Sequence, residues 1–465
     1  MPTMTLRQPR LALIACLLSI AAPLTAQKEA PPAPGTPKAF RLPPRKTVTL
    51  ANGMKLTMVR YGVVPKVTVS LQVGTGGIDE GAEEVQLSGL TADLLLEGTA
   101  TRSASDIARQ AAEMGGALSA LSSDNAVSIG GEVLAEFAQP FLGLVADVVQ
   151  HPRFAPADVD RLRGNRSRDN AIALSQPGQI TRQKFRQMIF GDHPYGRVFA
   201  TDSMLQSYTA ERVRAFHAAN YGARRAHLYV SGVFDPVKVE RAVRAVFSGW
   251  SAGPAPTINP PSPRSGRQLE LIDRPEAVQS SLRVGLPVAD PSSPDWVRLS
   301  VTDAILGGSF GSRITSNIRE DKGYTYSPFS FVGSWPGTGL WVEVADVTTN
   351  VTGPSLKEIF GEVERLRGEA PSGAELDRIK NNMAGLFTIQ NSSRFGVIGQ
   401  LQFVDQYGLG DGYLASYVQR VLAVTPADVQ QTAAKYLDPA KMTITVVGDK
   451  KAIEAQLEPY RPWVP

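Results

Sequence analysis

Side chains suited to binding a metal ion or moving a proton near neutral pH are scarce in this 465-residue chain. Histidine occurs four times, as His151, His193, His217 and His227. No two of them have the spacing that zinc sites use. His151 and His193 each precede a proline, which is typical of loops, and His227 begins an apolar run. We therefore predict structural roles for all four and no metal site in this chain.

Two carboxylates are placed where they could act together. Asp93 and Glu97 lie four residues apart in a stretch of helical character, so both point from one face of the helix. Two carboxylates fall short of the three or four ligands that protein zinc sites provide. We therefore predict that they belong to a solvent-exposed face.

The first 26 residues have the pattern of a secretory signal peptide. Two arginines precede an apolar run at residues 11–22, and a small-residue cleavage site ends at Ala26. Cleavage near Ala26 predicts a periplasmic or secreted protein. The sole cysteine, Cys16, would be lost with this segment, leaving no thiol and no disulfide. A second interpretation stays open, because residues 13–16 resemble a lipoprotein cleavage box that would anchor the chain through Cys16.

Composition and charge narrow the class of protein. Hydrophobic residues make up 43% and charged residues 20% of the chain, as in ordinary globular proteins. The formal net charge is +4 and the basic residues are scattered, which argues against binding to nucleic acid. After the N-terminal segment no stretch approaches about 20 apolar residues, so we predict no membrane span.

Two proline-rich stretches divide the rest of the chain. Residues 27–45 read as an extended tether and residues 251–267 as a linker between domains. The two blocks between and after them, 46–250 and 268–465, end alike. Each ends with a helix opened by a threonine, then a tyrosine, an apolar strand, a tight turn and a last helix. An internal duplication follows, with two homologous domains.

The starts of the blocks define the fold class. Asn52-Gly53 joins two strands in a predicted hairpin, and residues 67–73 alternate as a third strand. Amphipathic helices are predicted between the strands, and Ser372 with Glu375 has the pattern of a capping box. We predict an α+β fold, in which each domain packs helices on an antiparallel-rich sheet.

Residues 307–326, GGSFGSRITSNIREDKGYTY, resemble the second-domain signature of the pitrilysin/insulinase-type (inverzincin) zinc peptidases. That signature reads Gly-Gly-x-x-x-Ser-Arg-Leu, then Leu-Arg-Glu, then Gly-x-x-Tyr. Three other segments agree with the family in the same order, at residues 113–129, 191–197 and 272–285. The resemblance spans residues 46–460 and implies that the chain forms one half of a clamshell.

The resemblance also exposes a missing motif. Family enzymes carry H-x-x-E-H on the first long helix, with the histidines on zinc and the Glu as general base. The matching segment, residues 88–99, contains no histidine. Two alignments put at the motif positions either Ala92, Leu95 and Leu96 or Gly89, Ala92 and Asp93. The resemblance also implies a further Glu ligand roughly 70–80 residues on, which is absent too, since no Glu occurs between Glu136 and Glu211. The resemblance therefore implies no zinc in this chain.

What remains of the family site is an Arg/Tyr pair. In two-subunit members the zinc chain lacks this pair and its partner supplies it, and the pair maps onto Arg319 and Tyr326. We expect Arg319 near the end of a helix at 312–322, stopped by Gly323, and Tyr326 on the next strand, facing the same side as Tyr324. The preceding turn is expected to contact substrate through Gly307, Gly308, Gly311 and Ser312. Arg313 is interpreted as a surface charge.

The resemblance thus implies a non-catalytic subunit, inactive alone, of a heterodimeric zinc endopeptidase. A homologous partner with H-x-x-E-H would hold the zinc, and a peptide would bind as an extended strand at a sheet edge. Two alternatives stay open. One is a structural protein, as in the family-like core subunits of respiratory cytochrome complexes. The other is a peptide-binding, chaperone-like homodimer of the cell envelope.

Overall fold

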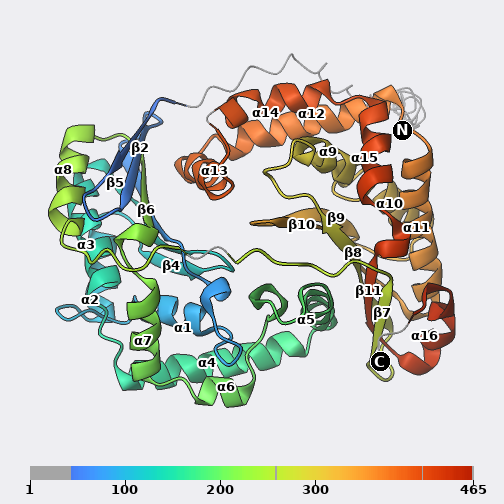
Figure 1. Cartoon of the computed structure of the whole chain (residues 1–465), viewed down its shortest axis with the longest axis horizontal. Helices are drawn as coiled ribbons and strands as arrows, with labels where there is room; N and C mark the ends of the chain where they lie inside the picture. Colours follow the sequence, from blue (N-terminus) through green and yellow to red (C-terminus); the bar gives the residue numbers. More distant parts are fainter. Residues whose placement is uncertain (1–42, 257–258, 411, 463–465) are drawn as a thin grey trace, which may run out of the picture. The chain divides into compact units, whose positions relative to one another are not determined.

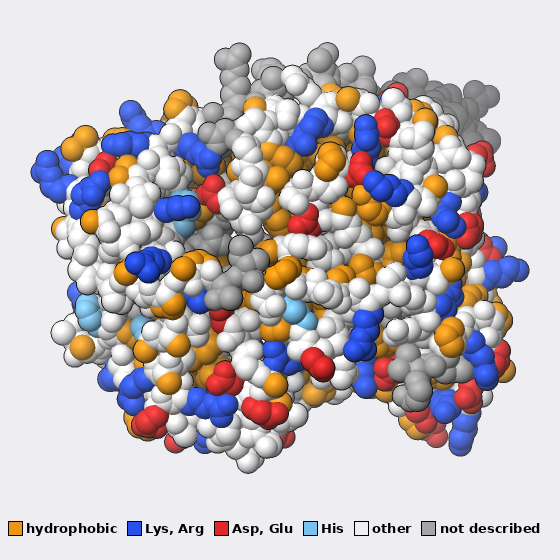
Figure 2. Space-filling view, viewed as in Figure 1, with side chains coloured by type: hydrophobic (Ala, Val, Ile, Leu, Met, Phe, Trp, Pro, Cys, Tyr) orange, Lys and Arg blue, Asp and Glu red, His pale blue; other side chains and the backbone are white. Residues whose placement is uncertain are grey.

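The computed structural model describes residues 43–256, 259–410 and 412–462. The predicted signal peptide and all but the last three residues of the tether lie outside these ranges. Within the described part of the chain, no helix is long and apolar enough to cross a membrane. On the face seen in Figure 2, basic and acidic side chains are interspersed.

A six-stranded sheet forms the centre of the first domain. Its strands run in the order β1-β2-β6-β3-β5-β4. Their bounds are β1 Arg45–Thr49, β2 Lys55–Arg60, β3 Lys66–Val73, β4 Ser119–Ser122, β5 Val127–Leu134 and β6 Ala226–Gly232. The predicted hairpin is confirmed, because β1 and β2 pair antiparallel and Gly53 has φ +96°. A side chain at that φ would be strained, so the turn favours glycine.

The described residues of the first block form eight α-helices. They are α1 Leu87–Leu94, α2 Ala104–Glu113, α3 Ala138–Gln150, α4 Pro156–Leu174, α5 Pro177–Phe190, α6 Asp202–Gln206, α7 Ala210–Asn220 and α8 Pro236–Phe247. The largest buried cluster joins apolar residues of α1, α3 and α8 to the strands of the first sheet. Burial of this apolar surface is the main force that holds the domain together.

The second domain repeats the first. Its sheet has the order β7-β11-β8-β10-β9, which matches β2-β6-β3-β5-β4 strand for strand. The strands are β7 Gln268–Asp273, β8 Gln279–Val288, β9 Phe329–Trp335, β10 Thr338–Thr348 and β11 Thr443–Gly448. One pair in each sheet is parallel, β2 with β6 and β7 with β11, and the other pairs are antiparallel. The predicted duplication and α+β class are confirmed.

The helices of the second domain correspond to those of the first. They are α9 Trp296–Leu306, α10 Arg313–Thr315, α11 Thr352–Gly368, α12 Gly373–Gln390, α13 Arg394–Gln406, α14 Gly412–Ala423, α15 Pro426–Tyr436 and α16 Lys450–Leu457. The equivalent helices α7 and α15 begin alike, because Thr209 and Thr425 each accept a hydrogen bond from a backbone N–H of the first turn. Such caps satisfy amides that the helix itself leaves unpaired.

One helix from each block crosses to the other sheet (Figure 1). Helix α5 packs on β8 and β11, and its Phe185 joins a buried cluster with Leu340 and Val342. The equivalent helix α13 packs on β3 and β6, where Leu401 joins a cluster with Tyr229. Each sheet is therefore covered partly by its own block and partly by the other block.

Candidate functional site

Arg319 and Tyr326 meet at one cavity of about 350 Å³ in the second domain. The cavity opens beside the turn that follows α9 and precedes β9. It is lined by Gly307, Gly308, Ser309, Phe310, Thr315, Arg319, Tyr326, Ser327, Pro328 and Phe329. The structure thus brings together the Arg/Tyr pair and the first two glycines of the turn.

The helix that carries Arg319 differs from the expected one. Instead of one α-helix over 312–322, the short α10 continues as a π-helix at Ser316–Asp321. Single π turns are rare and occur often at functional sites. The predicted stop is confirmed: Gly323 has φ +64°, and the N–H of Tyr324 donates to the carbonyl of Ile318 at 2.8 Å. The wider turn sets the direction in which Arg319 leaves the backbone.

Two aromatic rings hold the Arg319 side chain. The guanidinium carbon lies 4.5 Å from the ring centre of Phe310 and 5.1 Å from that of Tyr326. Both rings are largely exposed, Phe310 at 75% and Tyr326 at 81%. Stacking of a guanidinium on such rings is favourable while its N–H groups stay available to a ligand.

The expected position of Tyr326 is corrected by the structure. Tyr326 is not on a strand but in the segment that precedes β9. It does not share a side with Tyr324, whose ring packs against the core of the second domain. The reason is that the chain is still turning out of the π-helix here, so alternation along a strand has not begun. The phenol of Tyr326 therefore points away from the core.

The rest of the small-residue turn lies apart from this cavity. Ser312 is buried and its hydroxyl donates to Thr315 Oγ1 at 2.9 Å. The carbonyl of Gly311 accepts from Arg378 at 2.8 Å. Arg313 is not a surface charge, because its guanidinium makes two hydrogen bonds, of 2.8 and 2.9 Å, to Glu375. The Glu375 carboxylate therefore does not complete the predicted capping box with Ser372. Ser372 still caps α12, because its side chain accepts a hydrogen bond from the backbone N–H of Glu375.

Two buried acids lie beneath the glycines. Asp303 of α9 accepts from Ser330 at 2.5 Å and from the indole N–H of Trp341 at 2.9 Å. Glu343 of β10 is buried with neither carboxyl oxygen bonded within the described residues. Burial raises the pKa of Asp303 to about 6 and raises that of Glu343 well above its usual value. A Cβ at Gly307 would come within 2.6 Å of Glu343 Oε2, so only glycine fits there.

Sequence reasoning missed this pair of acids. Each carboxylate interrupts an apolar run, Asp303 in VTDAIL and Glu343 in LWVEVADV. A charged residue in an otherwise buried pattern is the signal that could have found them, since carboxylates are rarely buried without a partner.

The helix expected to match the zinc motif is α1. Its exposed carboxylate Asp93 pairs with Arg166 of α4 at 2.5 Å, and Glu97, just after α1, pairs with Arg161 at 2.5 Å. The predicted solvent-exposed face therefore holds for Asp93 but not for the half-buried Glu97, and arginines of α4 pair with both carboxylates. Among the described residues, no group of three His, Cys, Asp or Glu side chains could hold a metal ion.

Comparison with protein families assigns both halves of the chain. Residues 59–202 match "Insulinase (Peptidase family M16)", and residues 207–383 match "Peptidase M16 inactive domain". This chain belongs to peptidase family M16. The resemblance seen in residues 307–326 is thereby confirmed.

Similar M16 proteins cover most of the chain. A protein of Streptomyces coelicolor described as an uncharacterized zinc protease is 26% identical, over 88% of this chain and 91% of its own length. One of Mycobacterium tuberculosis with the same description is 28% identical, over 77% and 81%. The solved structure of the peptidase M16 inactive domain from Pseudomonas fluorescens is 25% identical, with a TM-score of 0.81 over 87% of this chain and 98% of that one. A protease from Helicobacter pylori shares the fold, with a TM-score of 0.82 at 20% identity, over 88% of this chain and 100% of that one.

The zinc of M16 enzymes does not fit the residues present here. Of the two alignments of the motif, the one that uses Leu95 and Leu96 puts ligands beyond the end of α1, where Leu95 is fully buried in the apolar core. The other uses Gly89, Ala92 and Asp93, of which only Asp93 has a donor atom. One carboxylate, already paired with a guanidinium, is no zinc site.

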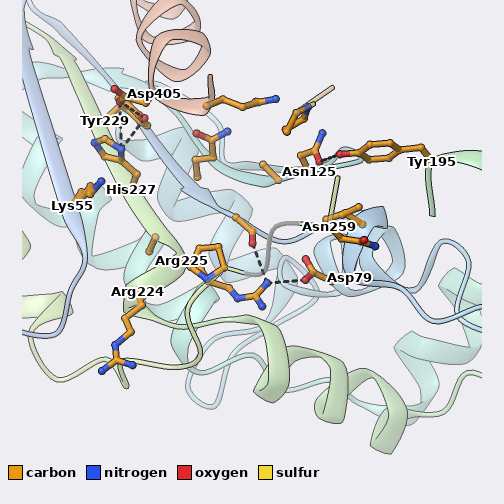
Figure 3. A pocket seen from close by; sticks show the side chains of 18 residues that line it. Lys55, Asp79, Asn125, Tyr195, Arg224, Arg225, His227, Tyr229, Asn259 and Asp405 are labelled. Atoms are coloured by element: carbon orange, nitrogen blue, oxygen red, sulfur yellow. Dashed lines mark hydrogen bonds and ion pairs between the residues drawn. The ribbon is translucent and has the colours of Figure 1, made fainter. Parts of the chain in front are cut away.

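A second cavity, of about 370 Å³, lies between the first sheet and α13 (Figure 3). On its wall His227 and Tyr229 of β6 face Asp405 of α13. The Tyr229 hydroxyl donates to Asp405 at 2.8 Å and lies 2.8 Å from His227 Nδ1. On the other side Arg225 pairs with Asp79 at 2.9 Å. The contacts of Tyr229 and His227 with Asp405 join the two blocks of this M16 chain, whereas the Arg225–Asp79 pair lies within the first block.

The surroundings of His227 resemble a nucleophile–base–acid arrangement. Its Nε2 lies 2.8 Å from Thr57 Oγ1, and its Nδ1 lies 3.5 Å from Asp405. Thr57 is only 1% exposed, however, so no substrate carbonyl could reach its hydroxyl. Burial lowers the pKa of His227 to about 4, although Asp405 acts in the opposite direction. The cluster therefore serves to join β6 to α13.

The other histidines contact residues both near to and far from them in the sequence. His151 lies 3.2 Å from Asp147, one turn before it. His193 accepts from the N–H of Tyr195 at 3.2 Å and caps a short turn. His217 lies 2.9 Å from the carbonyl of Val149 and stacks on Tyr221, and burial lowers its pKa to about 4. These contacts are consistent with structural roles for the three histidines.

Proposed function

We propose that this chain is the complementary subunit of a heterodimeric M16 metalloendopeptidase. In this proposal a homologous partner with H-x-x-E-H carries the zinc, and this chain contributes Arg319 and Tyr326. The observation that carries it is the convergence of these two side chains on one cavity, in a chain whose α1 lacks zinc ligands.

The chemistry of the pair fits this role. The Tyr326 hydroxyl and the Arg319 guanidinium are both hydrogen-bond donors, and Arg keeps its charge at any physiological pH. Donors aimed at a peptide carbonyl would stabilise the negative charge that develops on its oxygen, and zinc held by the partner would supply the activated water. The rings of Tyr326 and Phe310 hold the guanidinium in place. The Arg319 side chain therefore loses little conformational entropy when substrate binds.

Removal of one donor tests the proposal. Cleavage of a quenched peptide is measured with the H-x-x-E-H partner alone, with this chain alone, and with both mixed. We expect activity only in the mixture, and we expect Tyr326→Phe to lower kcat by about 10²–10³-fold, as for other oxyanion donors. KM should change little, since the donor acts mainly in the transition state.

Tyr324→Phe is the matched control, because it removes the same hydroxyl from a ring that packs on the core. Full activity of the partner alone, unchanged by this chain, would refute the proposal. Equal activity of wild type and Tyr326→Phe would favour a structural or peptide-binding role instead. Retention of an uncleaved peptide by this chain alone would then identify the peptide-binding alternative.

We further propose that the chain is exported after cleavage near Ala26. The support is the sequence pattern of residues 1–26. Intact mass of the protein from the periplasmic fraction or medium tests it: a chain beginning at residue 27 is expected, and a lipid-modified Cys16 or an uncleaved cytoplasmic chain would contradict it.

A further inference from the structure

We propose that the guanidinium of Arg166 occupies the place between α1 and α4 that the metal ion takes in zinc-bearing M16 chains. The interface between α1 and α4 is then stabilised by this guanidinium and needs no metal. This inference concerns the first domain and does not depend on the role of Arg319.

The first support is which face of α1 is turned to α4. Gly89 and Asp93 are four residues apart and lie on one helical face. A Cβ built at Gly89 would come within 2.9 Å of Nη1 and 3.3 Å of Nη2 of Arg166. The guanidinium therefore fills the space in which the side chain of position 89 would stand. This is also the face on which the alignment that uses Gly89, Ala92 and Asp93 places the two histidines of the motif.

The second support is the charge around the guanidinium. Nη2 of Arg166 donates to Asp93 Oδ2 at 2.5 Å, and the Arg166 side chain is only 20% exposed. Burial raises the pKa of Asp93, whereas the charge of Arg166 acts to lower it. Burial raises the pKa of Glu80 to about 8, and the N–H groups of Ser88 and Gln86 together with the charges of Arg197 and Arg166 act against that rise. The Arg166 guanidinium thus lies beside acids whose ionisation is disfavoured by burial, and its charge acts against that effect.

The Arg166 guanidinium excludes both a histidine at position 89, on steric grounds, and a metal ion, on electrostatic grounds. An imidazole at position 89 would collide with the guanidinium, and a divalent ion within a few ångströms of Arg166 would be strongly repelled. Arg also has no lone pair to offer and stays protonated, so it cannot serve as a ligand. Restoring the histidines alone should therefore not restore a metal site.

Two variants of the full chain test this directly. The first is Gly89→His with Asp93→His, which keeps Arg166. The second adds Arg166→Glu, so that two imidazoles and one carboxylate replace the three groups that now meet. Zinc per chain is measured by elemental analysis after dialysis. We expect close to none in the first variant and about one equivalent in the second.

Equal zinc in the two variants would overturn the proposal, as would a folded second variant that holds no zinc. Stability provides a readout that does not rely on the redesigned site. Arg166→Met should lower the thermal midpoint by several degrees in the presence of a chelator, and adding Asp93→Asn should recover part of the loss.

The neighbouring pair Arg161–Glu97 supplies the matched control, since it joins the same segments with a more exposed arginine. Arg161→Met should shift the midpoint less, as expected for an exposed ion pair. Equal shifts for Arg166→Met and Arg161→Met would contradict the special place of Arg166.

Discussion

At the scale of single residues, the Arg319 side chain is oriented by its neighbours. Phe310, nine positions earlier, and Tyr326, seven positions later, place their rings against its guanidinium. The close packing at Gly307 is a second residue-scale feature, because a Cβ there would come within 2.5 Å of Ser330 Oγ and 2.6 Å of Glu343 Oε2. Both features depend on side chains that meet only after folding.

The acid beneath the glycine turn makes stability depend on pH. We expect Asp303→Asn to raise the free energy of unfolding at pH 7 by about 3 kcal/mol, because the folded carboxyl has a pKa of about 6 and the unfolded one about 3.8. At neutral pH the Asp303 carboxylate is ionised in the unfolded chain. Folding must therefore either protonate it or bury its charge, and both lower the free energy of unfolding. The amide keeps an acceptor for Ser330 and Trp341.

The direction in which the stability difference changes with pH provides an internal control. Below about pH 3.8 both states are protonated, so wild type and Asp303→Asn should differ least there, and the gap should widen as pH rises towards about 6. Urea unfolding at several pH values measures it. Asp377→Asn, at an exposed site, should show no such trend. A gap independent of pH would contradict the raised pKa of Asp303.

At the scale of elements, local signals predict helix starts and stops well. Thr425 caps α15 and forms a capping box with Asp428, and Pro426 stands in the first turn, where its missing N–H costs no hydrogen bond. The same reasoning placed Gly323 at the end of the helix that carries Arg319. It could not foresee the π-helix, because the extra residue per turn is accommodated by packing of Ile318 in the second core.

A cap substitution measures this local contribution. We expect Thr425→Ala to lower the free energy of unfolding by about 1 kcal/mol, since the backbone N–H of Asp428 loses its acceptor, the Thr425 hydroxyl. Thr209→Ala should cost a similar amount at the duplicated site in α7. Thr101→Ala, in an exposed loop, is the control in the same urea titration. A cost for Thr425→Ala no larger than that control would contradict the capping role.

At the scale of the whole molecule, the exchange of α5 and α13 makes the two blocks depend on each other. Phe185 of the first block is buried against Leu340 and Val342 of the second sheet. From the other side, Arg394 of α13 pairs with Glu132 of β5 at 2.8 Å. Neither sheet can bury its face with its own helices alone, so the blocks should unfold together.

This dependence predicts the effect of a core substitution at the crossing. Phe185→Ala should lower the free energy of unfolding by about 3–5 kcal/mol, because it removes a buried ring and leaves a cavity. Unfolding should remain a single transition, coincident by fluorescence and circular dichroism. Ile189→Val, on the same helix, should cost only about 0.5–1.5 kcal/mol. Two separate transitions in Phe185→Ala would show that the blocks fold independently.

The sequence by itself determined what depends on neighbours along the chain. The hairpin at Gly53, the cap at Thr425, the stop at Gly323 and the duplicated order of elements all follow from residues a few positions apart. The absence of a zinc motif in residues 88–99 is equally a property of the sequence. Turn and cap energies are local, so local patterns reveal them.

Only the tertiary structure decided which distant groups meet. Arg166 lies 73 residues from Asp93 along the chain, and Asp303 lies 27 residues from Ser330. The crossing of α5 to the second sheet likewise has no signal in its own residues. Burial and ion pairing act through space, and in a single sequence these contacts carry no mark until the chain has folded.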